Sequence, residues 1–381
     1  MQNKVRMGMV GGGEGAFIGA VHRLAANLDG QIELVCGAFS SDPQRSIASG
    51  QALGLPAARI YEDFHAMFAT EQALPVEQRM EFVAIVTPNH LHFPVATAAL
   101  SHGFHVLSDK PATLNLSQAL ALRDQLAGQA LQYGLTHTYL GYPMVLEAKL
   151  RVAAGQLGTI RKVMVQYPQG WLARREEDTD NKQARWRLDP TQAGVSSCMG
   201  DIGVHAFNLA EYISGSQVTE LCADLTSFVS GRTLDDDGSV LLRFEGGAKG
   251  VLSASQVSVG EENGLAIAIY GEQGGLKWQQ QEPNTLWWMP QDEPVQMLRT
   301  GGGYLAEQTG TLIRTPMGHP EGYIEAFANL YLDFARQVSG GDNSLQLCPG
   351  VEAAVRGMGF IELAVAASAS DQKWHKLDFA D

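Results

Sequence analysis

Short apolar runs alternate with helix-patterned stretches over the first third of the chain. The apolar runs are expected to be buried strands, over residues 5–10, 32–38, 82–87 and 105–107. The stretches between them place apolar residues at helical spacing, over 18–28, 43–53, 91–102 and 117–131. Strands that alternate with helices in this way predict a parallel sheet with helices on both faces.

The pattern changes after about residue 139. The expected elements are a helix over 143–154, a long strand over 160–169, a charged loop over 174–187 and a helix from 202. Residues 218–298 read mostly as strands joined by glycine turns, as in antiparallel hairpins, and helices follow over 321–338 and 351–367. We expect two domains, an α/β domain over 1–138 and an α+β domain over 139–381 with a large open, mainly antiparallel sheet.

The hairpin-rich stretch 218–298 also bears on assembly. Too few helices follow its strands to cover both faces of an antiparallel sheet. An uncovered apolar face needs a partner, so we expect a homodimer or homotetramer formed through this sheet.

Three consecutive glycines follow the first expected strand and lead into the first helix. Gly11, Gly12 and Gly13 allow a tight turn and a close approach of the main chain to a pyrophosphate at the helix N-terminus. Ala16 completes a GxGxxA pattern, but Gly19 fits equally as the glycine that packs the helix, displaced by an insertion. The surrounding pattern favours a dinucleotide-binding Rossmann domain over a simple strand-to-helix turn.

The end of the second strand bears on the choice of dinucleotide. An NAD-selective site places a carboxylate roughly 20 residues beyond the glycines, whereas Phe39, Ser40 and Ser41 stand here. Asp42 precedes a proline and is the expected N-cap of a helix. Ser40, Ser41 and Arg45 can donate to a 2′-phosphate, so they favour NADP while NAD stays open.

Composition and charge narrow the classes of partner. The 381 residues include 27 Lys and Arg against 41 Asp and Glu, a net charge of −14, which disfavours nucleic acid. No run reaches the ~18 apolar residues of a membrane helix, and no signal peptide is readable, so we expect a cytoplasmic protein without a membrane partner. Four widely spaced cysteines, and His90 and His92 without a carboxylate ligand, indicate no metal site.

The candidate catalytic residues are Lys110 and the polar residues on one face of a later helix. Lys110 follows a strand and precedes a proline, which puts it at the carboxyl edge of the parallel sheet, where such folds bind ligands. In the second half, Asp201, His205 and Asn208 fall on one helical face. Alone, Lys110 reads as a surface charge, Asp201 as an N-cap and His205 as an interface histidine.

Together these motifs resemble the Gfo/Idh/MocA oxidoreductase family over essentially the whole chain. The motifs that carry the resemblance are GMVGGG with IGxxH, the run from Thr87 to His92, the triplet DKP, the pair Trp186-Arg187 and GDIGVH. The resemblance implies a nucleotide-binding domain followed by an open-sheet domain, sugar or cyclitol chemistry, and matching functional positions at Lys110, Asp201 and His205. Cofactor contacts are expected at Thr87, Pro88, Asn89, His92, Asp109 and Lys110. The chain departs from the family pattern at Asp109, which stands for Glu, at Asn208, which stands for Asp, and at the insertion in the glycine loop.

The expected reaction is the oxidation of a ring hydroxyl. A neutral His205 would take the hydroxyl proton, Lys110 would stabilise the developing alkoxide, and Asp201 would orient His205 or hold a neighbouring hydroxyl. Weaker candidates for contact with a sugar are Tyr142, Trp171, Trp186, Arg187, Asn208 and His319. Two alternatives stay open, an NAD-dependent glycosidase that oxidises its substrate transiently and a non-catalytic sensor of dinucleotide or sugar.

Overall fold

The computed structural model describes residues 4–379, and the chain forms two compact units. The first contains Met1–Thr138 and Phe327–Val355, and the second contains Tyr139–Ala326 and Arg356–Asp381. The first division falls after Thr138. The sequence pattern predicts a single domain over 139–381, whereas 327–355 belongs to the first unit.

The late segment joins the first unit because its apolar side chains pack there. The ring of Phe334 meets that of Phe82 edge-on, with centroids 5.3 Å apart. The main-chain N–H of Leu135 donates to the carbonyl of Pro349 over 2.8 Å, and the side chain of Cys348 is buried beside it. Contacts between residues so distant in sequence leave no trace in a local hydrophobic pattern.

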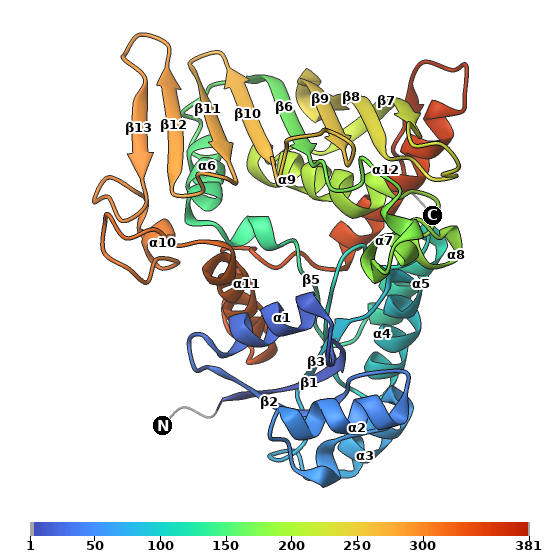
Figure 1. Cartoon of the computed structure of the whole chain (residues 1–381). Coiled ribbons are helices and arrows are strands. Elements are labelled where there is room, and N and C mark those ends of the chain that lie inside the picture. Colours follow the sequence, from blue (N-terminus) through green and yellow to red (C-terminus); the bar gives the residue numbers. More distant parts are fainter. Residues whose placement is uncertain (1–3, 380–381) are drawn as a thin grey trace. The chain divides into compact units, whose positions relative to one another are not determined.

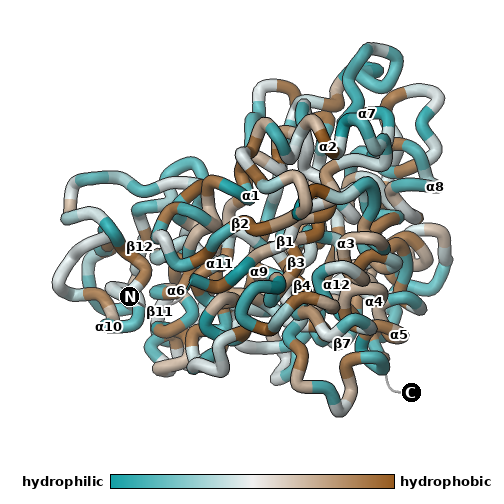
Figure 2. The backbone as a smooth tube through the Cα atoms, turned by 90° about the horizontal axis from the view of Figure 1, so that it is seen from below, coloured by the Kyte–Doolittle hydropathy of each residue, from teal (hydrophilic) through white to brown (hydrophobic). Residues whose placement is uncertain are grey.

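Five parallel strands form the sheet of the first unit, in the order β2-β1-β3-β4-β5 among the described residues. They are β1 (Val5–Gly11), β2 (Ile32–Ala38), β3 (Phe82–Val86), β4 (His105–Ser108) and β5 (Tyr133–Leu135). The central strand β3 is buried over its whole length and is coloured hydrophobic in Figure 2. This sheet confirms the expected Rossmann-like fold of the N-terminal domain.

Helices connect these strands. They are α1 (Phe17–Asn27), α2 (Pro43–Ala52), α3 (Phe64–Ala73), α4 (His92–Ser101) and α5 (Leu116–Leu126), with 3₁₀ turns η1 (Ala57–Arg59) and η2 (Asn89–Leu91). Two later helices, α11 (Tyr323–Val338) and α12 (Val351–Ser368), each begin in one unit and end in the other. The sequence pattern missed α3 and β5, and it extended α5 beyond its actual end at Leu126.

The second unit is built on a nine-stranded sheet, in the order β13-β12-β11-β10-β6-β9-β8-β7-β14 over the part of the chain described. Its strands are β6 (Ile160–Pro168), β7 (Val218–Thr226), β8 (Asp237–Phe244), β9 (Lys249–Ser255), β10 (Ala266–Gly271), β11 (Gly274–Gln279), β12 (Thr285–Pro290), β13 (Gln296–Arg299) and β14 (His375–Lys376). Neighbours pair antiparallel except β6 and β9. The expected mainly antiparallel sheet is confirmed.

Helices α6 (Pro143–Ala153) and α9 (Val204–Ser214) pack on one face of this sheet (Figure 1). The shorter elements of the unit are η3 (Thr138–Gly141), which begins at the unit boundary, η4 (Glu176–Asp178), α7 (Lys182–Arg187), α8 (Pro190–Ala193), η5 (Met199–Gly203), η6 (Glu245–Gly247) and α10 (Glu307–Gly310).

The other face of the sheet carries a row of side chains that are apolar at every position but one. One residue from each of eight neighbouring strands lies in register in this row, from β13 to β7: Met297, Trp287, Lys277, Ala268, Met164, Val251, Leu241 and Cys222. All eight are exposed or half-exposed, and Lys277 alone among them is charged. We call these residues the apolar row.

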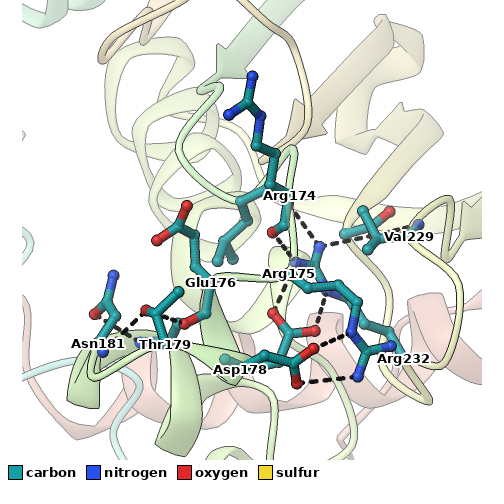
Figure 3. A network of polar contacts seen from close by, with 12 residues as sticks. Arg174, Arg175, Glu176, Asp178, Thr179, Asn181, Val229 and Arg232 are labelled. Carbon is teal, nitrogen blue, oxygen red and sulfur yellow. Dashed lines mark hydrogen bonds and ion pairs between the residues drawn. The ribbon is translucent and has the colours of Figure 1, made fainter.

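The charged stretch 174–187, expected to be a loop, is folded and anchored. It contains η4 and α7, and Arg232 from the turn before β8 anchors it. The buried guanidinium of Arg232 pairs with Glu177 and Asp236 and donates to the Arg174 carbonyl over 2.7 Å. Figure 3 shows this network together with the ion pair between Arg175 and Asp178. The anchoring holds α7, and with it Trp186 and Arg187, in a defined place.

Within residues 4–379, no helix is both long enough and apolar enough to cross a membrane.

Candidate functional site

The glycine segment lies where the strand order of the first sheet reverses. Strand β1 ends at Gly11 and pairs with β2 on one side and β3 on the other. A side chain at Gly11 would collide with the Val86 carbonyl at 2.4 Å and with Thr87 at 2.8 Å. The ends of β1 and β3 therefore meet at the switch point, the place where open parallel sheets bind nucleotides.

Helix α1 packs against the glycine segment at Gly19 and not at Ala16. Ala16 is the N-cap residue of α1, and a side chain added at Gly19 would meet the Cα of Gly12 at 2.4 Å. Both Gly11 and Gly12 have positive φ, of 83° and 68°, which side chains disfavour. The main chain is thus kept bare where a pyrophosphate would approach, so the geometry fits a dinucleotide.

The rest of the glycine segment is held by hydrogen bonds to residues that follow β2 or lie in α2. Gly13 donates its N–H to the Phe39 carbonyl over 3.2 Å, and a side chain there would strike that carbonyl at 2.7 Å. The N–H of Glu14 donates to the Ser49 hydroxyl over 3.0 Å. These contacts fix the loop before any ligand binds, which reduces the ordering cost of binding.

The residues expected near the ribose lie around the start of α2. Asp42 is the N-cap of α2 and accepts the N–H groups of Gln44 and Arg45, as expected. The Ser40 hydroxyl accepts the N–H of Asp42 over 3.1 Å, and Ser41 is exposed. The Arg45 guanidinium reaches the Glu14 carbonyl at 3.4 Å. Arg45 therefore lies beside the glycine segment.

Segment 87–92 follows β3 at the switch point, with Pro88 and Asn89 at the start of η2. Its His92 is fully buried and bridges two carbonyl oxygens, that of Thr87 at 2.8 Å and that of Pro111 at 2.7 Å. Burial lowers the pKa of His92, against the opposing influence of Asp109. His92 thus ties this segment to the DKP turn, and the cofactor contact expected at His92 stays a prediction. The Thr87 hydroxyl is one of the buried polar groups that lack a partner within the described chain.

The DKP turn follows β4 and is held by the Asp109 side chain. One carboxylate oxygen of Asp109 accepts the Lys110 N–H and the Thr136 hydroxyl, each over 2.8 Å. The Asp109 N–H donates to the Ile85 carbonyl, so the turn continues the sheet toward β3. Lys110 is half-buried there. The expected position of Lys110 at the carboxyl edge of the sheet agrees with this geometry.

Two residues of this region escaped the sequence analysis. Thr136 and His137 follow β5, and both are buried. Burial lowers the pKa of His137 to about 3, with Lys110 adding to the effect and Asp109 opposing it. They sit at a strand's carboxyl end, as Lys110 does, so recognition of the three-residue strand β5 would have found them.

In the second unit, Asp201 lies on a π-helical turn, η5, that leads into α9. The spacing of a regular α-helix therefore does not extend back from His205 to Asp201, contrary to the expected single face. The Asp201 carboxylate is 3.1 Å from Nε of Arg187 and accepts a 2.9 Å hydrogen bond from Gln256. Sequence reasoning missed Gln256, which follows the end of β9 and is fully buried.

Arg187 is held between its carboxylate partner and two indole rings. Its guanidinium lies 4.2 Å from the ring centroid of Trp186 and 6.0 Å from that of Trp171. Trp186 and Arg187 both bond to the Gln183 side chain. The expected pair Trp186-Arg187 is thus brought beside Asp201, at the end of α7 and not in a loop.

His205 is nearly buried on α9 and packs against tyrosines. Its ring meets Tyr139 edge-on at 4.9 Å and lies 6.4 Å from Tyr167. The two tyrosine hydroxyls bond to each other, and Asn263 donates to Tyr139 and accepts from Tyr167. Nearby, burial raises the pKa of Tyr142 above its usual value, with Gln280 opposing the effect. Tyr139, Tyr167 and Asn263 were not singled out from the sequence.

The other weak candidates differ in their surroundings. Oδ1 of Asn208 is buried without a hydrogen-bond partner in the described part of the chain. His319 is exposed, and its ring nitrogen Nδ1 meets the Pro316 carbonyl at 3.2 Å. Across residues 4–379, no three His, Cys, Asp or Glu side chains gather so as to hold a metal ion.

Comparison with known proteins decides the family. An oxidoreductase family model with an NAD-binding Rossmann fold matches residues 5–148, and a GFO/IDH/MocA C-terminal domain model matches 145–277. The chain belongs to the Gfo/Idh/MocA family of oxidoreductases. The resemblance inferred from the motifs is thereby confirmed.

Three proteins similar to this chain bear the names of oxidoreductases or dehydrogenases. An uncharacterised oxidoreductase of Bacillus subtilis, YfiI, is 32% identical over 97% of this chain and 96% of its own. The levoglucosan dehydrogenase of Pseudarthrobacter phenanthrenivorans is 26% identical over 72% and 73%. A crystal structure of an inositol dehydrogenase homologue from Azotobacter vinelandii with NAD⁺ has a TM-score of 0.93 and 35% identity, covering 99% and 98%. The same homologue complexed with NADH and myo-inositol gives a TM-score of 0.90 and 32% identity over the same shares.

Proposed function

We propose that this family member is a nicotinamide-dependent dehydrogenase that moves hydride between NAD or NADP and a ring hydroxyl or ketone of a sugar, glycoside or cyclitol. The observation that carries the proposal is the DKP turn, with Lys110 following β4 of the sheet whose switch point holds the glycine segment. An ammonium at that edge stands where ligands of such sheets bind. The printed names of the inositol dehydrogenase homologue and the levoglucosan dehydrogenase support the substrate class.

The proposed chemistry assigns a task to each of three side chains. When bound, the nicotinamide ring supplies the hydride acceptor. The neutral imidazole of His205 takes the hydroxyl proton, and the Lys110 ammonium stabilises the negative charge that develops on the same oxygen. Asp201, held by Arg187 and Gln256, accepts a hydrogen bond from a substrate hydroxyl.

The pairing of Arg187 supports an uncharged substrate. Its guanidinium already faces the Asp201 carboxylate at 3.1 Å, so the two charges offset each other. A sugar phosphate would have to compete with Asp201 for this cation, whereas hydroxyl groups can bond to both residues. The flanking indole rings of Trp171 and Trp186 offer flat surfaces suited to the C–H face of a sugar ring.

The choice between NAD and NADP rests on Ser40, Ser41 and Arg45. Their donors suit a 2′-phosphate, and Asp42, the neighbouring carboxylate, is engaged in capping α2. We expect Arg45→Ala to lower kcat/KM for NADP by about 10- to 100-fold while changing that for NAD little, because one charge-assisted contact contributes about 1.5–3 kcal/mol. Equal effects on both dinucleotides would remove Arg45 from the phosphate site.

The proposal is tested with a substrate panel. The purified chain is incubated with NAD or NADP and with inositols, free hexoses, glucosides or glucose 6-phosphate, and reduced nicotinamide is followed by absorbance. Reduced cofactor growing in proportion to a neutral ring polyol supports the proposal. Cleavage of a glycoside over many turnovers without net reduction would replace it with the NAD-dependent glycosidase, and binding without any turnover would replace it with the sensor.

A further inference from the structure

His22, on helix α1, is a buried polar residue to which the proposed reaction assigns no task. Its side chain is fully buried. Its neighbours on the same helix hold the glycine segment, since Gly19 packs against Gly12 and Arg23 donates to the Gly12 carbonyl over 2.6 Å. His22 itself contacts Tyr331 and Asp109. One helix therefore reaches both the glycine segment and the DKP turn.

The two ring nitrogens of His22 have different partners. Nδ1 lies 2.7 Å from the Tyr331 hydroxyl, which is a hydrogen bond. Nε2 lies 3.8 Å from Oδ2 of Asp109, an electrostatic contact longer than a hydrogen bond, and has no other partner within the described residues. If Tyr331 donates to Nδ1, the proton stands on Nε2 and faces the carboxylate, which is the favourable tautomer here.

The Asp109 carboxylate links this histidine to Lys110. Its Oδ1 is taken by the Lys110 N–H and the Thr136 hydroxyl, and its Oδ2 is the atom nearest His22. Burial alone would raise the pKa of Asp109, but His22, Lys110 and His92 hold that pKa well below its usual range. The carboxylate is therefore kept ionised and is restrained from both sides.

We propose that His22 is a positioning residue for Lys110. Together with Tyr331 it fixes the Asp109 carboxylate, which in turn fixes the main chain at Lys110. Because His22 shares α1 with the residues that hold Gly12, it also ties the Lys110 turn to the dinucleotide loop. The inference rests on the proposed function, in which Lys110 acts on the substrate oxygen.

A purely structural histidine would behave differently. The His22 ring also meets Phe327 edge-on at 4.6 Å, so it fills space in the core of the first unit. If packing were its whole role, a ring of similar size without nitrogens would preserve the geometry of Lys110. Only the nitrogens can act on Asp109, and His22→Phe removes them while keeping an aromatic ring.

The first experiment compares His22→Phe with the matched control His102→Phe in the full chain. His102 ends α4, and its Nδ1 bonds to the Ala98 carbonyl away from the DKP turn. We expect His22→Phe to lower kcat per folded molecule by about 10- to 100-fold, as for a misplaced reacting group. The dinucleotide Kd of His22→Phe and the kcat of His102→Phe should each stay within roughly threefold of the parent. An unchanged kcat at equal folded fraction would overturn the proposal.

The second experiment needs no turnover. Limited acetylation with acetic anhydride, read by peptide mass spectrometry, gives the reactivity of Lys110 relative to the exposed Lys373. We expect His22→Phe and Asp109→Asn each to change this ratio at least about threefold, and the double variant to add nothing further, because one acts through the other. Additive changes, or no change in His22→Phe, would overturn the proposal.

The two experiments separate the inference from the proposed function. A changed Lys110 ratio in a protein that oxidises nothing would leave the positioning role standing and remove the dehydrogenase proposal. An unchanged ratio in a protein that is active as a dehydrogenase would remove the positioning role and leave the dehydrogenase proposal standing.

Discussion

The carboxylate of Asp235 accepts the main-chain N–H of Met199 over 2.9 Å and so fixes the start of the π-helix that carries Asp201. It also accepts the N–H of Ser197 and the hydroxyl of Ser196, each over 3.0 Å. Burial raises the pKa of Asp235, and these hydrogen bonds oppose the effect. π-Helical turns are rare and concentrate at functional sites, and here the turn sets where Asp201 meets Arg187 and Gln256.

Replacing Lys110 tests the catalytic assignment directly. We expect Lys110→Ala to lower kcat by on the order of 10² to 10⁴, while dinucleotide Kd stays within a few-fold, because a positioned charge on the reacting oxygen is lost. Steady-state kinetics and dinucleotide titration measure the two effects. Lys373→Ala, at an exposed position between α12 and β14, is the control. Near-normal turnover at saturating substrate would make Lys110 a surface charge.

The pH profile tests His205. A base must be neutral to accept the hydroxyl proton, so the limiting rate of the parent should rise with pH. We expect His205→Asn to lose this rising limb and to be slowed most at neutral pH. Rates measured across the pH range at saturating substrate check this. A variant that keeps the parent profile would exclude His205 as the base.

Asp201 is compared with a carboxylate that only caps a helix. Asp189 caps α8 by accepting the N–H of Thr191, and Asp189→Ala should cost ~1 kcal/mol of stability with unchanged kinetics. Asp201→Ala should instead raise KM for the sugar and lower kcat, because Arg187 and Gln256 lose their shared partner. Kinetics and thermal unfolding of both variants are the measurements. Equal kinetics in the two variants would reduce Asp201 to a structural role.

The lowered pKa of His137 makes the stability of the fold depend on pH. Below its ordinary value of 6.5 the unfolded chain binds a proton that the folded chain, with a His137 pKa of about 3, does not. The folded state therefore loses about 1.4 kcal/mol for each pH unit below 6.5, down to about pH 3. We expect His137→Gln not to lose this stability. The unfolding free energy of the variant should therefore rise relative to that of the parent as pH falls. Denaturant curves for the two proteins that run parallel with pH would contradict the assignment.

The apolar row leads us to expect self-association through the open face of the nine-stranded sheet. A carboxylate placed in the row would be desolvated in such an interface, so Met164→Asp should dissociate the oligomer. Light scattering at micromolar concentration measures the mass, and Gln51→Asp, exposed on α2, adds the same charge elsewhere. A parent that is already a monomer would contradict the expectation.

Local patterns were sufficient for the first four strands and for the glycine segment. Burial on both faces makes β3 a continuous apolar run, and the first two helices begin within one residue of the expected positions. Lys110 could be placed because the carboxyl edge of a parallel sheet follows from chain order alone.

What the sequence could not give depended on distant partners. The π-helical turn needs Asp235, the fold of 174–187 needs the buried guanidinium of Arg232, and Gln256 meets Asp201 only through the sheet. Short elements such as β5 carry too few residues to show a period. The links from His22 to Asp109 and Tyr331 join residues far apart in the chain, so no spacing rule detects them.

The return of residues 327–355 to the first unit has a consequence for synthesis on the ribosome. The Rossmann sheet gains Phe334 against Phe82, and the carbonyl of Pro349 against Leu135, only after residues 139–326 of the second unit have been made. The first unit therefore cannot complete its core when its five strands emerge. A fragment ending at Thr138 would leave this apolar surface uncovered, so the first unit can close only after most of the second unit has been synthesised.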